Sequence, residues 1–417
     1  MIRKFTFFLL ILVVSSCYSP RSLNSVNLSS LYKQSDNVFH PEINVWNHGD
    51  TSVLLSVKVN LGEFLFSRQA DETFQTKIKV VAEIVRSYDE AQLLDSASST
   101  FNFDIKDKNS SALLQVNLTT HQIDELLMKC TIIDMNKNYQ EDFYSKFSIE
   151  DNSRNDFQIR NKENVLVFRN YFSSLDTIKI SFRDTSKSEF WCKYYHRDFP
   201  LPPPPFSNDA HEAFSYAADS VFKLSLKDTS ELTFPKQGFY HIQSDSSKKS
   251  GLTLFRFDSG YPTVSTPKQL LEPLRYLTSR KEYEDMERSP NLKSAVEAFW
   301  LARGGNEERT RGLIKKFYSR VQDANRFFAS YTEGWKTDRG MVFIVFGGPN
   351  ALYLSSNSES WTYGTPNSTL ALNFFFAKVN NPFTDNDFSL SRSPIYEANW
   401  YRAVETWRQG RAYNNLN

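Results

Sequence analysis

The chain has little of several residue types that would identify a function. Its 417 residues carry 49 basic and 48 acidic side chains, so no excess of positive charge attracts nucleic acid, and we expect no nucleic-acid partner. All six histidines precede residue 250, and the last cysteine is Cys192. The C-terminal part therefore lacks the side chains of Cys-His and Ser-His-Asp nucleophile sites. We expect no catalytic residue, metal or cofactor.

Long apolar runs are also lacking, apart from one at the N-terminus. Phe5–Val14 is almost wholly apolar and follows two basic residues, but a bilayer span needs roughly twenty residues. The run is therefore typical of a signal peptide, expected over 1–16. It ends in Val-Ser-Ser-Cys17, which resembles the lipobox of bacterial lipoproteins, where acyl chains such as palmitate on the cysteine bind a membrane. An ordinary secretory signal with a chance cysteine is the alternative.

The residues after Cys17 indicate where such an anchor would hold the chain. Tyr18 stands in place of the aspartate that retains lipoproteins in the inner membrane, and no short acidic cluster that would direct the chain to the cell surface follows. We therefore expect the outer membrane, with the chain facing the periplasm. Residues 17–40 are rich in Ser and Asn and lack periodicity, so we expect a flexible tether.

Alternating apolar and polar residues dominate from residue 41 to 260, as in Phe101-Asn-Phe-Asp-Ile105. A period of two predicts half-buried strands, and the turn-rich gaps between such runs are typical of antiparallel sandwiches. A polar break at 150–161 divides the region. We predict a β-sandwich over 41–152 and a second, smaller one over 153–260.

Two features of this region leave alternatives open. Residues 200–206 contain five prolines, which force an extended conformation without amide donors. They form either a stiff crossover between strands or a docking motif for an aromatic groove. Cys130 and Cys192 lie in predicted strands, either as two buried, unpaired residues or as a disulfide.

Beyond residue 262 the apolar pattern changes to the period of helices. An apolar stripe of residues three and four apart, including Leu313, Phe317 and Val321, indicates an amphipathic helix. We predict helices over 267–278, 291–303, 306–330 and 393–407, and strands over Met341–Phe346 and Thr369–Ala377. These elements predict an α+β domain over 262–417. The fold expected overall is multidomain and β-rich, with two antiparallel β-sandwich modules followed by this α+β domain.

One motif carries a resemblance to a known family. Gly334-Trp335-Lys336-Thr337-Asp338 follows the longest predicted helix and resembles the GWxTD domain, a bacterial envelope domain prevalent in Bacteroidota. Further matching residues are Phe299, Trp300, Tyr318, Arg320, Val321, Ala324, Asn325, Phe327, Phe346-Gly347-Gly348-Pro349 and Glu359–Tyr363. The resemblance covers about 290–380. It implies a lipoprotein-like or secreted protein, often with β-sandwich modules in front, and no established activity.

Folding alone accounts for the motif. We expect Gly334 to take a positive φ and end the helix, and Trp335 to be buried. Thr337 and Asp338 should fix a tight turn through nearby amides, at a cost of about 1 kcal/mol if the carboxylate is lost. Gly340 should admit the start of a buried strand. The candidate motif residues, expected to be structural with binding as the alternative, are Gly334, Trp335, Thr337, Asp338, Arg320, Asn325, Gly348 and Pro349.

We expect a non-enzymatic accessory or scaffold subunit of an envelope assembly or secretion machine, with envelope proteins as partners. The abundance of Phe, Tyr and Trp suits such a role, since aromatic residues are common interface anchors. Two alternatives stay open. One is a glycan- or ligand-binding module. The other is an envelope hydrolase in which Asp338 and Glu359 act near Arg320, as paired carboxylates do in glycoside cleavage.

Overall fold

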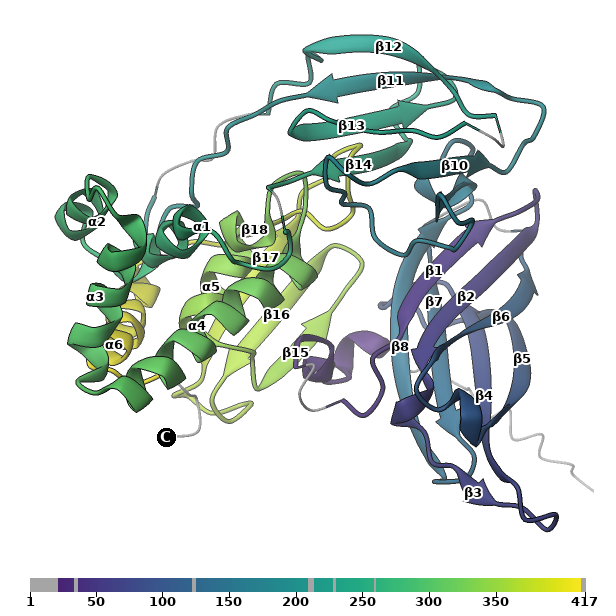
Figure 1. Ribbon diagram of the computed structural model, residues 1–417, viewed down its shortest axis with the longest axis horizontal. Helices are drawn as coiled ribbons and strands as arrows, with labels where there is room; N and C mark the ends of the chain where they lie inside the picture. The colour runs from purple at the N-terminus through teal and green to yellow at the C-terminus, as the bar shows by residue number, and fades with distance from the viewer. Residues whose placement is uncertain are drawn as a thin grey trace, which may run out of the picture.

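The computed structural model describes residues 22–33, 37–121, 125–208, 214–227, 230–258 and 260–413 (Figure 1). The signal peptide predicted over 1–16 and the lipid site predicted at Cys17 lie outside these residues. The described chain is rich in strands, which form several antiparallel sheets, and its α-helices lie in the C-terminal region. Within the described ranges, no helix is long and apolar enough to cross a membrane.

The first module is a sandwich of two antiparallel sheets. One sheet has the order β1-β2-β6, and the other has the order β3-β4-β7-β8 with β5 paired to β4. Apolar residues from both sheets, such as Val57, Val80 and Ile132, are buried in one shared core, as alternation along the strands predicts. The strands are β1 Glu42–Asn47, β2 Ser52–Asn60, β3 Ser67–Arg68, β4 Phe74–Val85, β5 Leu93–Asp104, β6 Ser111–Thr119, β7 Glu125–Asp134 and β8 Tyr139–Ser148.

The second module is smaller and also consists of two antiparallel sheets. One sheet pairs β9 with β10, and the other has the order β12-β11-β13-β14. Phe157, Phe190 and Ile242 belong to its core, which draws on both sheets. The short 3-10 helix η6 (Arg154–Asp156) connects this module to the first one. The strands are β9 Phe157–Asn161, β10 Ile178–Phe182, β11 Glu189–Tyr195, β12 Ser220–Ser225, β13 Gly238–Gln243 and β14 Leu252–Arg256.

The C-terminal module combines helices with one antiparallel sheet of order β15-β16-β17-β18. Helices α4 and α5 lie across this sheet (Figure 1), and aromatic pairs join the two layers: Phe328 of α4 lies 5.4 Å from Trp361 of β16, and Phe346 of α5 lies 5.2 Å from Phe374 of β17. The elements are α1 Pro267–Leu271, α2 Arg280–Glu287, α3 Leu292–Gly304, α4 Glu307–Phe328, α5 Asp338–Phe346, β15 Ala351–Leu354, β16 Ser358–Tyr363, β17 Leu372–Lys378, β18 Phe388–Leu390 and α6 Glu397–Arg408.

The strand predicted over Met341–Phe346 is wrong, because these residues belong to the helix α5. Every residue of α5 is buried, so its apolar run has no polar face, and such a run does not distinguish a helix from a strand. The helix signal is local. Thr337 is the N-cap, and its Oγ1 accepts a hydrogen bond from the Gly340 amide at 3.0 Å. Gly340 therefore lies in the first turn of a helix rather than at the start of a strand.

Residues 22–33, called the strap below, differ from the flexible tether expected over 17–40. They contain the 3-10 helices η1 (Leu23–Ser25) and η2 (Ser29–Tyr32), and Figure 1 shows them between β15 and the first sandwich. The Leu28 amide donates to the Leu352 carbonyl at 2.8 Å, and the Asn24 amide donates to the Tyr88 carbonyl at 3.0 Å. These bonds to two modules hold the strap, and composition alone does not reveal them.

The two cysteines of the described residues are buried and unpaired. Cys130 lies in the core of the first sandwich, and Cys192 lies in the core of the second module. Burial raises the pKa of each thiol to about 12, because the thiolate is poorly solvated there. The first of the two alternatives left open by the sequence is therefore the observed one.

Candidate functional site

The motif segment joins α4 to α5 through two close backbone approaches. A Cβ on Gly334 would lie 1.9 Å from the carbonyl oxygen of Ala324, and a Cβ on Gly340 would lie 1.9 Å from the carbonyl oxygen of Gly334. Gly334 does not have the positive φ that we expected, and α4 ends earlier, at Phe328. Glycine is required at both positions because no side chain fits between the packed backbones.

Trp335 and Asn325 hold this segment in place. Trp335 is buried, as predicted. Its amide donates to Asn325 Oδ1 at 3.1 Å, and its carbonyl accepts from the Tyr276 hydroxyl at 2.8 Å. Asn325 Nδ2 in turn donates to the Pro262 carbonyl at 3.1 Å. Asn325 thus uses both ends of its amide to bind the motif and the start of the C-terminal module.

Asp338 makes a long-range ion pair instead of fixing a tight turn, which corrects our expectation. Its carboxylate forms a short ion pair with Arg392 and accepts a hydrogen bond from the Leu390 amide at 2.7 Å. Thr337 does act locally, because its hydroxyl also donates to the Gly334 carbonyl at 2.8 Å. The Asp338 side chain is 2% exposed and that of Arg392 9%, so the pair is shielded from water.

Arg392 also binds the proline-rich segment. Its Nη2 donates to the Pro203 carbonyl at 3.1 Å, and the neighbouring Ser393 amide donates to the Pro205 carbonyl at 3.0 Å. Phe206 packs on Tyr401 of α6 with ring centroids 5.3 Å apart. The prolines are thus a crossover that docks on the chain's own C-terminal module. We call the chain of contacts Asp338–Arg392–Pro203 the proline tie.

The next residue of α5, Arg339, reaches a different segment. Its Nη1 lies 2.6 Å from Glu359 Oε1 of β16, and both side chains are almost fully buried. Glu359 also accepts a hydrogen bond from the Tyr32 hydroxyl at 3.1 Å and from Trp361 Nε1 at 3.0 Å. We call Arg339–Glu359–Tyr32 the strap tie. Consecutive residues of α5 therefore hold the proline crossover and the strap.

The remaining motif residues stabilise the end of α5. Arg320 donates to the carbonyls of Ile344 and Val345, each at 3.2 Å, and burial lowers its pKa to about 10. A cation at the C-terminus of a helix is favourable because of the helix dipole. Gly348 lies against the strap, since a Cβ there would be 3.2 Å from Lys33 Cγ, and Pro349 is buried.

The structure does not bring Asp338 and Glu359 together around Arg320, as the hydrolase alternative required. Each carboxylate pairs with a different arginine, Arg392 or Arg339, and Arg320 binds backbone carbonyls instead. Sequence reasoning did not identify these two arginines, and no motif spacing points to them. Among the residues that the structure describes, no group of three or more His, Cys, Asp or Glu is arranged to hold a metal.

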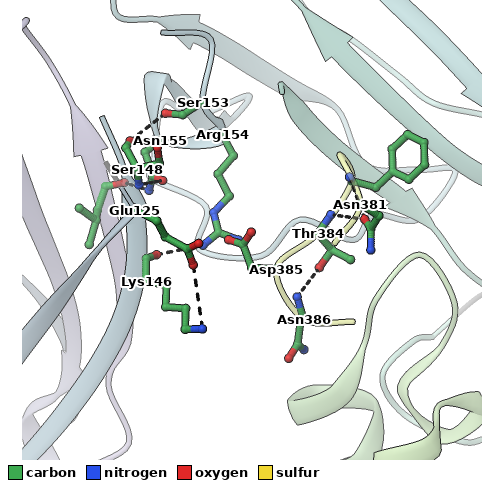
Figure 2. A network of polar contacts seen from close by, with 12 residues as sticks. Glu125, Lys146, Ser148, Ser153, Arg154, Asn155, Asn381, Thr384, Asp385 and Asn386 are labelled. Atoms are coloured by element: carbon green, nitrogen blue, oxygen red, sulfur yellow. Dashed lines mark hydrogen bonds and ion pairs between the residues drawn. The ribbon is translucent and has the colours of Figure 1, made fainter. Parts of the chain in front are cut away.

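A cleft of about 1020 Å³, called the inter-module cleft below, lies where all three modules meet. It is lined by Glu125, by Tyr216 and by residues of the segments 147–155, 193–195, 241–251 and 380–385. Figure 2 shows Arg154, next to the first sandwich, reaching Asp385 of the C-terminal module, at 2.7 Å. This arginine lowers the pKa of Asp385. The sequence carries no signal for the cleft, because its walls come from distant segments that share no motif.

Comparison with known protein families identifies a domain in the C-terminal part of the chain. The GWxTD domain matches residues 238–409. A comparison with curated proteins finds no match. The crystal structure of red sea bream transglutaminase is similar at 10% sequence identity over 55% of this chain, with a TM-score of 0.18. The chain spans 33% of that protein's length, and a likeness at this TM-score bears on neither fold nor function.

The match begins at Gly238, the first residue of β13, and not near 262 as we expected. The packing gives a reason, because Phe239 and Phe255 of β13 and β14 form one buried cluster with Phe383 of the C-terminal module. These two strands belong structurally to both modules. Residues 238–409 of this chain form a GWxTD domain.

Proposed function

We propose that the protein is a non-enzymatic lipoprotein of the outer membrane, as in Bacteroidota-type envelope proteins, anchored through Cys17 and facing the periplasm. In this proposal it is an accessory or scaffold subunit of an envelope assembly or secretion machine. The lipobox-like Val-Ser-Ser-Cys17 at the end of an apolar run supports the anchor.

The proline tie and the strap tie are the observation that carries the scaffold role. In both ties, charged side chains of the motif region bind other segments of the chain and hold them together. Neither Asp338 nor Glu359 lines the inter-module cleft. Further contacts join the modules, such as Lys378 with Glu125 at 3.0 Å. A chain built to keep its modules in a fixed arrangement is suited to presenting surfaces to partners.

The anchor is tested by Cys17→Ala in cells that carry the tagged full-length chain. We expect the wild type to fractionate with outer membranes and to resist protease added to intact cells. The variant should be released or remain unprocessed. If the variant fractionates as the wild type does, the lipid anchor is wrong, and protease digestion of the wild type on intact cells would contradict the inward orientation.

The scaffold role is tested by purifying the tagged wild type from detergent-solubilised outer membranes. We expect a defined envelope protein to co-purify in a fixed ratio with the wild type. The control variant Glu307→Ala removes an exposed carboxylate of α4 and should retain the same partner in the same ratio. Absence of any stoichiometric partner would contradict the proposal. So would turnover of an envelope glycan or peptide that Asp338→Asn abolishes in a folded protein.

A further inference from the structure

The lining of the inter-module cleft carries no net charge. Four basic side chains and four carboxylates line it, and several of them pair with each other, such as Lys248 with Asp151 at 2.7 Å. Burial lowers the pKa of His241, which also lines the cleft, to about 4, so the ring adds no charge at neutral pH. An ionic ligand would therefore find no net attraction.

Uncharged polar side chains make up much of the rest of the cleft lining, and one of them has an oxygen without a hydrogen-bond partner. Gln243 is 1% exposed, and its Nε2 donates to the carbonyls of Lys248 and Lys249 in the β13–β14 turn. These bonds orient the amide, and its Oε1 has no hydrogen-bond partner among the described residues. A buried acceptor without a partner is costly. Since Oε1 is itself buried, the hydrogen-bonding groups open to a ligand are the exposed side chains of the lining, Ser246, Ser247 and Asn380.

An exposed aromatic ring lies at the same cleft. Tyr216 is 54% exposed. Its ring stacks on the buried Phe383, with centroids 5.9 Å apart and planes inclined by 23°. Phe383 thus holds the ring from one side, so the open side is an apolar platform held in a fixed orientation. Such a platform suits the C–H face of a sugar ring, whose hydroxyls need donors and acceptors nearby.

An extended peptide fits this cleft less well, because the strand end that lines it is already saturated. The Lys146 carbonyl of β8 accepts from Arg154 Nη2 at 2.9 Å. The Ser148 amide donates to Asn155 Oδ1 at 3.1 Å, and its carbonyl accepts from Asn47 Nδ2 at 2.9 Å. No backbone ladder is left at these positions to which a further strand could be added.

We propose that the inter-module cleft is a binding site for a neutral saccharide, with Tyr216 as the stacking platform and the exposed Ser246, Ser247 and Asn380 as hydrogen-bonding groups. The volume is that of ligand sites in general, which often lie where domains meet. The proposal does not depend on the lipid anchor or on the scaffold role, since a soluble form of the chain would bind equally well.

The test is calorimetric titration of the full-length chain with neutral tetrasaccharides, namely maltotetraose, cellotetraose and chitotetraose, beside tetragalacturonate and an Ala-Ser tetrapeptide. We expect at least one neutral tetrasaccharide to bind, and Tyr216→Ala to weaken it about tenfold, the effect of losing one aromatic contact. The matched control is Tyr401→Ala, which removes a tyrosine of similar exposure, 55%, outside the cleft. It should leave the affinity unchanged.

Equal thermal stability of the variants would show that the loss is local. If Tyr216→Ala fails to fold, Asn380→Trp, which fills the cleft from its exposed rim, should abolish binding in its place. The proposal is overturned if no neutral tetrasaccharide binds at millimolar concentration. It is also overturned if Tyr216→Ala or Asn380→Trp leaves the affinity unchanged, or if only tetragalacturonate or the tetrapeptide binds.

Discussion

Removal of the Asp338 carboxylate should destabilise the GWxTD domain far more than a turn-fixing role would. In Asp338→Ala, the buried Arg392 guanidinium loses the carboxylate of this ion pair, and the Leu390 amide loses its acceptor. Breaking a buried ion pair by removing one partner costs about 3–5 kcal/mol. The expectation from sequence alone was about 1 kcal/mol, so the two interpretations differ by an amount that is easily measured.

The assay is urea denaturation of the full-length chain, followed by far-UV circular dichroism. The matched control is Glu307→Ala, which removes the carboxylate of an ion pair with Arg311 whose side chains are 78% and 77% exposed. Exposed pairs on a helix are worth about 0.5 kcal/mol or less. The reasoning is refuted if Asp338→Ala loses no more stability than Glu307→Ala.

Two further variants separate charge from packing. Asp338→Asn keeps an acceptor for the Leu390 amide but not the charge, so we expect an intermediate loss. The double variant Asp338→Leu/Arg392→Met should recover much of the loss, because apolar residues often replace a buried ion pair at little cost. In Asp338→Ala, the Ser393 amide, bonded to Pro205 in the wild type, should also lose protection from hydrogen exchange, which reports on the proline tie directly.

Three other outcomes are expected. Trp335→Ala removes a buried indole and should cost about 3–5 kcal/mol in the same denaturation assay; a loss under 1 kcal/mol would contradict its anchoring role. Tyr32→Phe removes a donor to the buried Glu359, and about 1.5–3 kcal/mol should be lost together with exchange protection of the strap; an unchanged strap would show that this bond does not hold it. Burial raises the pKa of Asp387 to about 6 and lowers that of His241 to about 4. Between about pH 4 and 6, native Asp387 holds more protons than the unfolded chain does and native His241 holds fewer, so the first contribution to stability falls with rising pH and the second rises. From about pH 4 to about pH 6, the unfolding free energy of Asp387→Asn should therefore change in a more positive direction than that of the wild type, and that of His241→Gln in a more negative direction. Denaturation at both pH values measures this change, and variants that change as the wild type does would argue against both shifts.

The sequence by itself determined those elements whose signal lies within the element. Alternation such as that of Phe101 and Phe103 in β5 describes one strand face against a core, and it predicted strands in both β-rich modules. Ile105 departs from it, because this residue lies in a 3-10 helix and is 46% exposed. The apolar stripe through Leu313 and Phe317 likewise predicted α4. The GWxTD motif could also be recognised in the sequence, because its glycines and tryptophan are close together in the chain.

Only the tertiary structure decided the features that depend on distant partners. Helix α5 is buried on all sides, so its residues carry no period, and its cap at Thr337 was the one local signal. Asp338 and Arg392 are 54 residues apart, and Tyr32 and Glu359 are 327 apart. No local rule pairs such residues, because any buried carboxylate needs a partner but its own segment does not specify which one. The strap and the inter-module cleft exist for the same reason, since their contacts form only when the three modules have packed together.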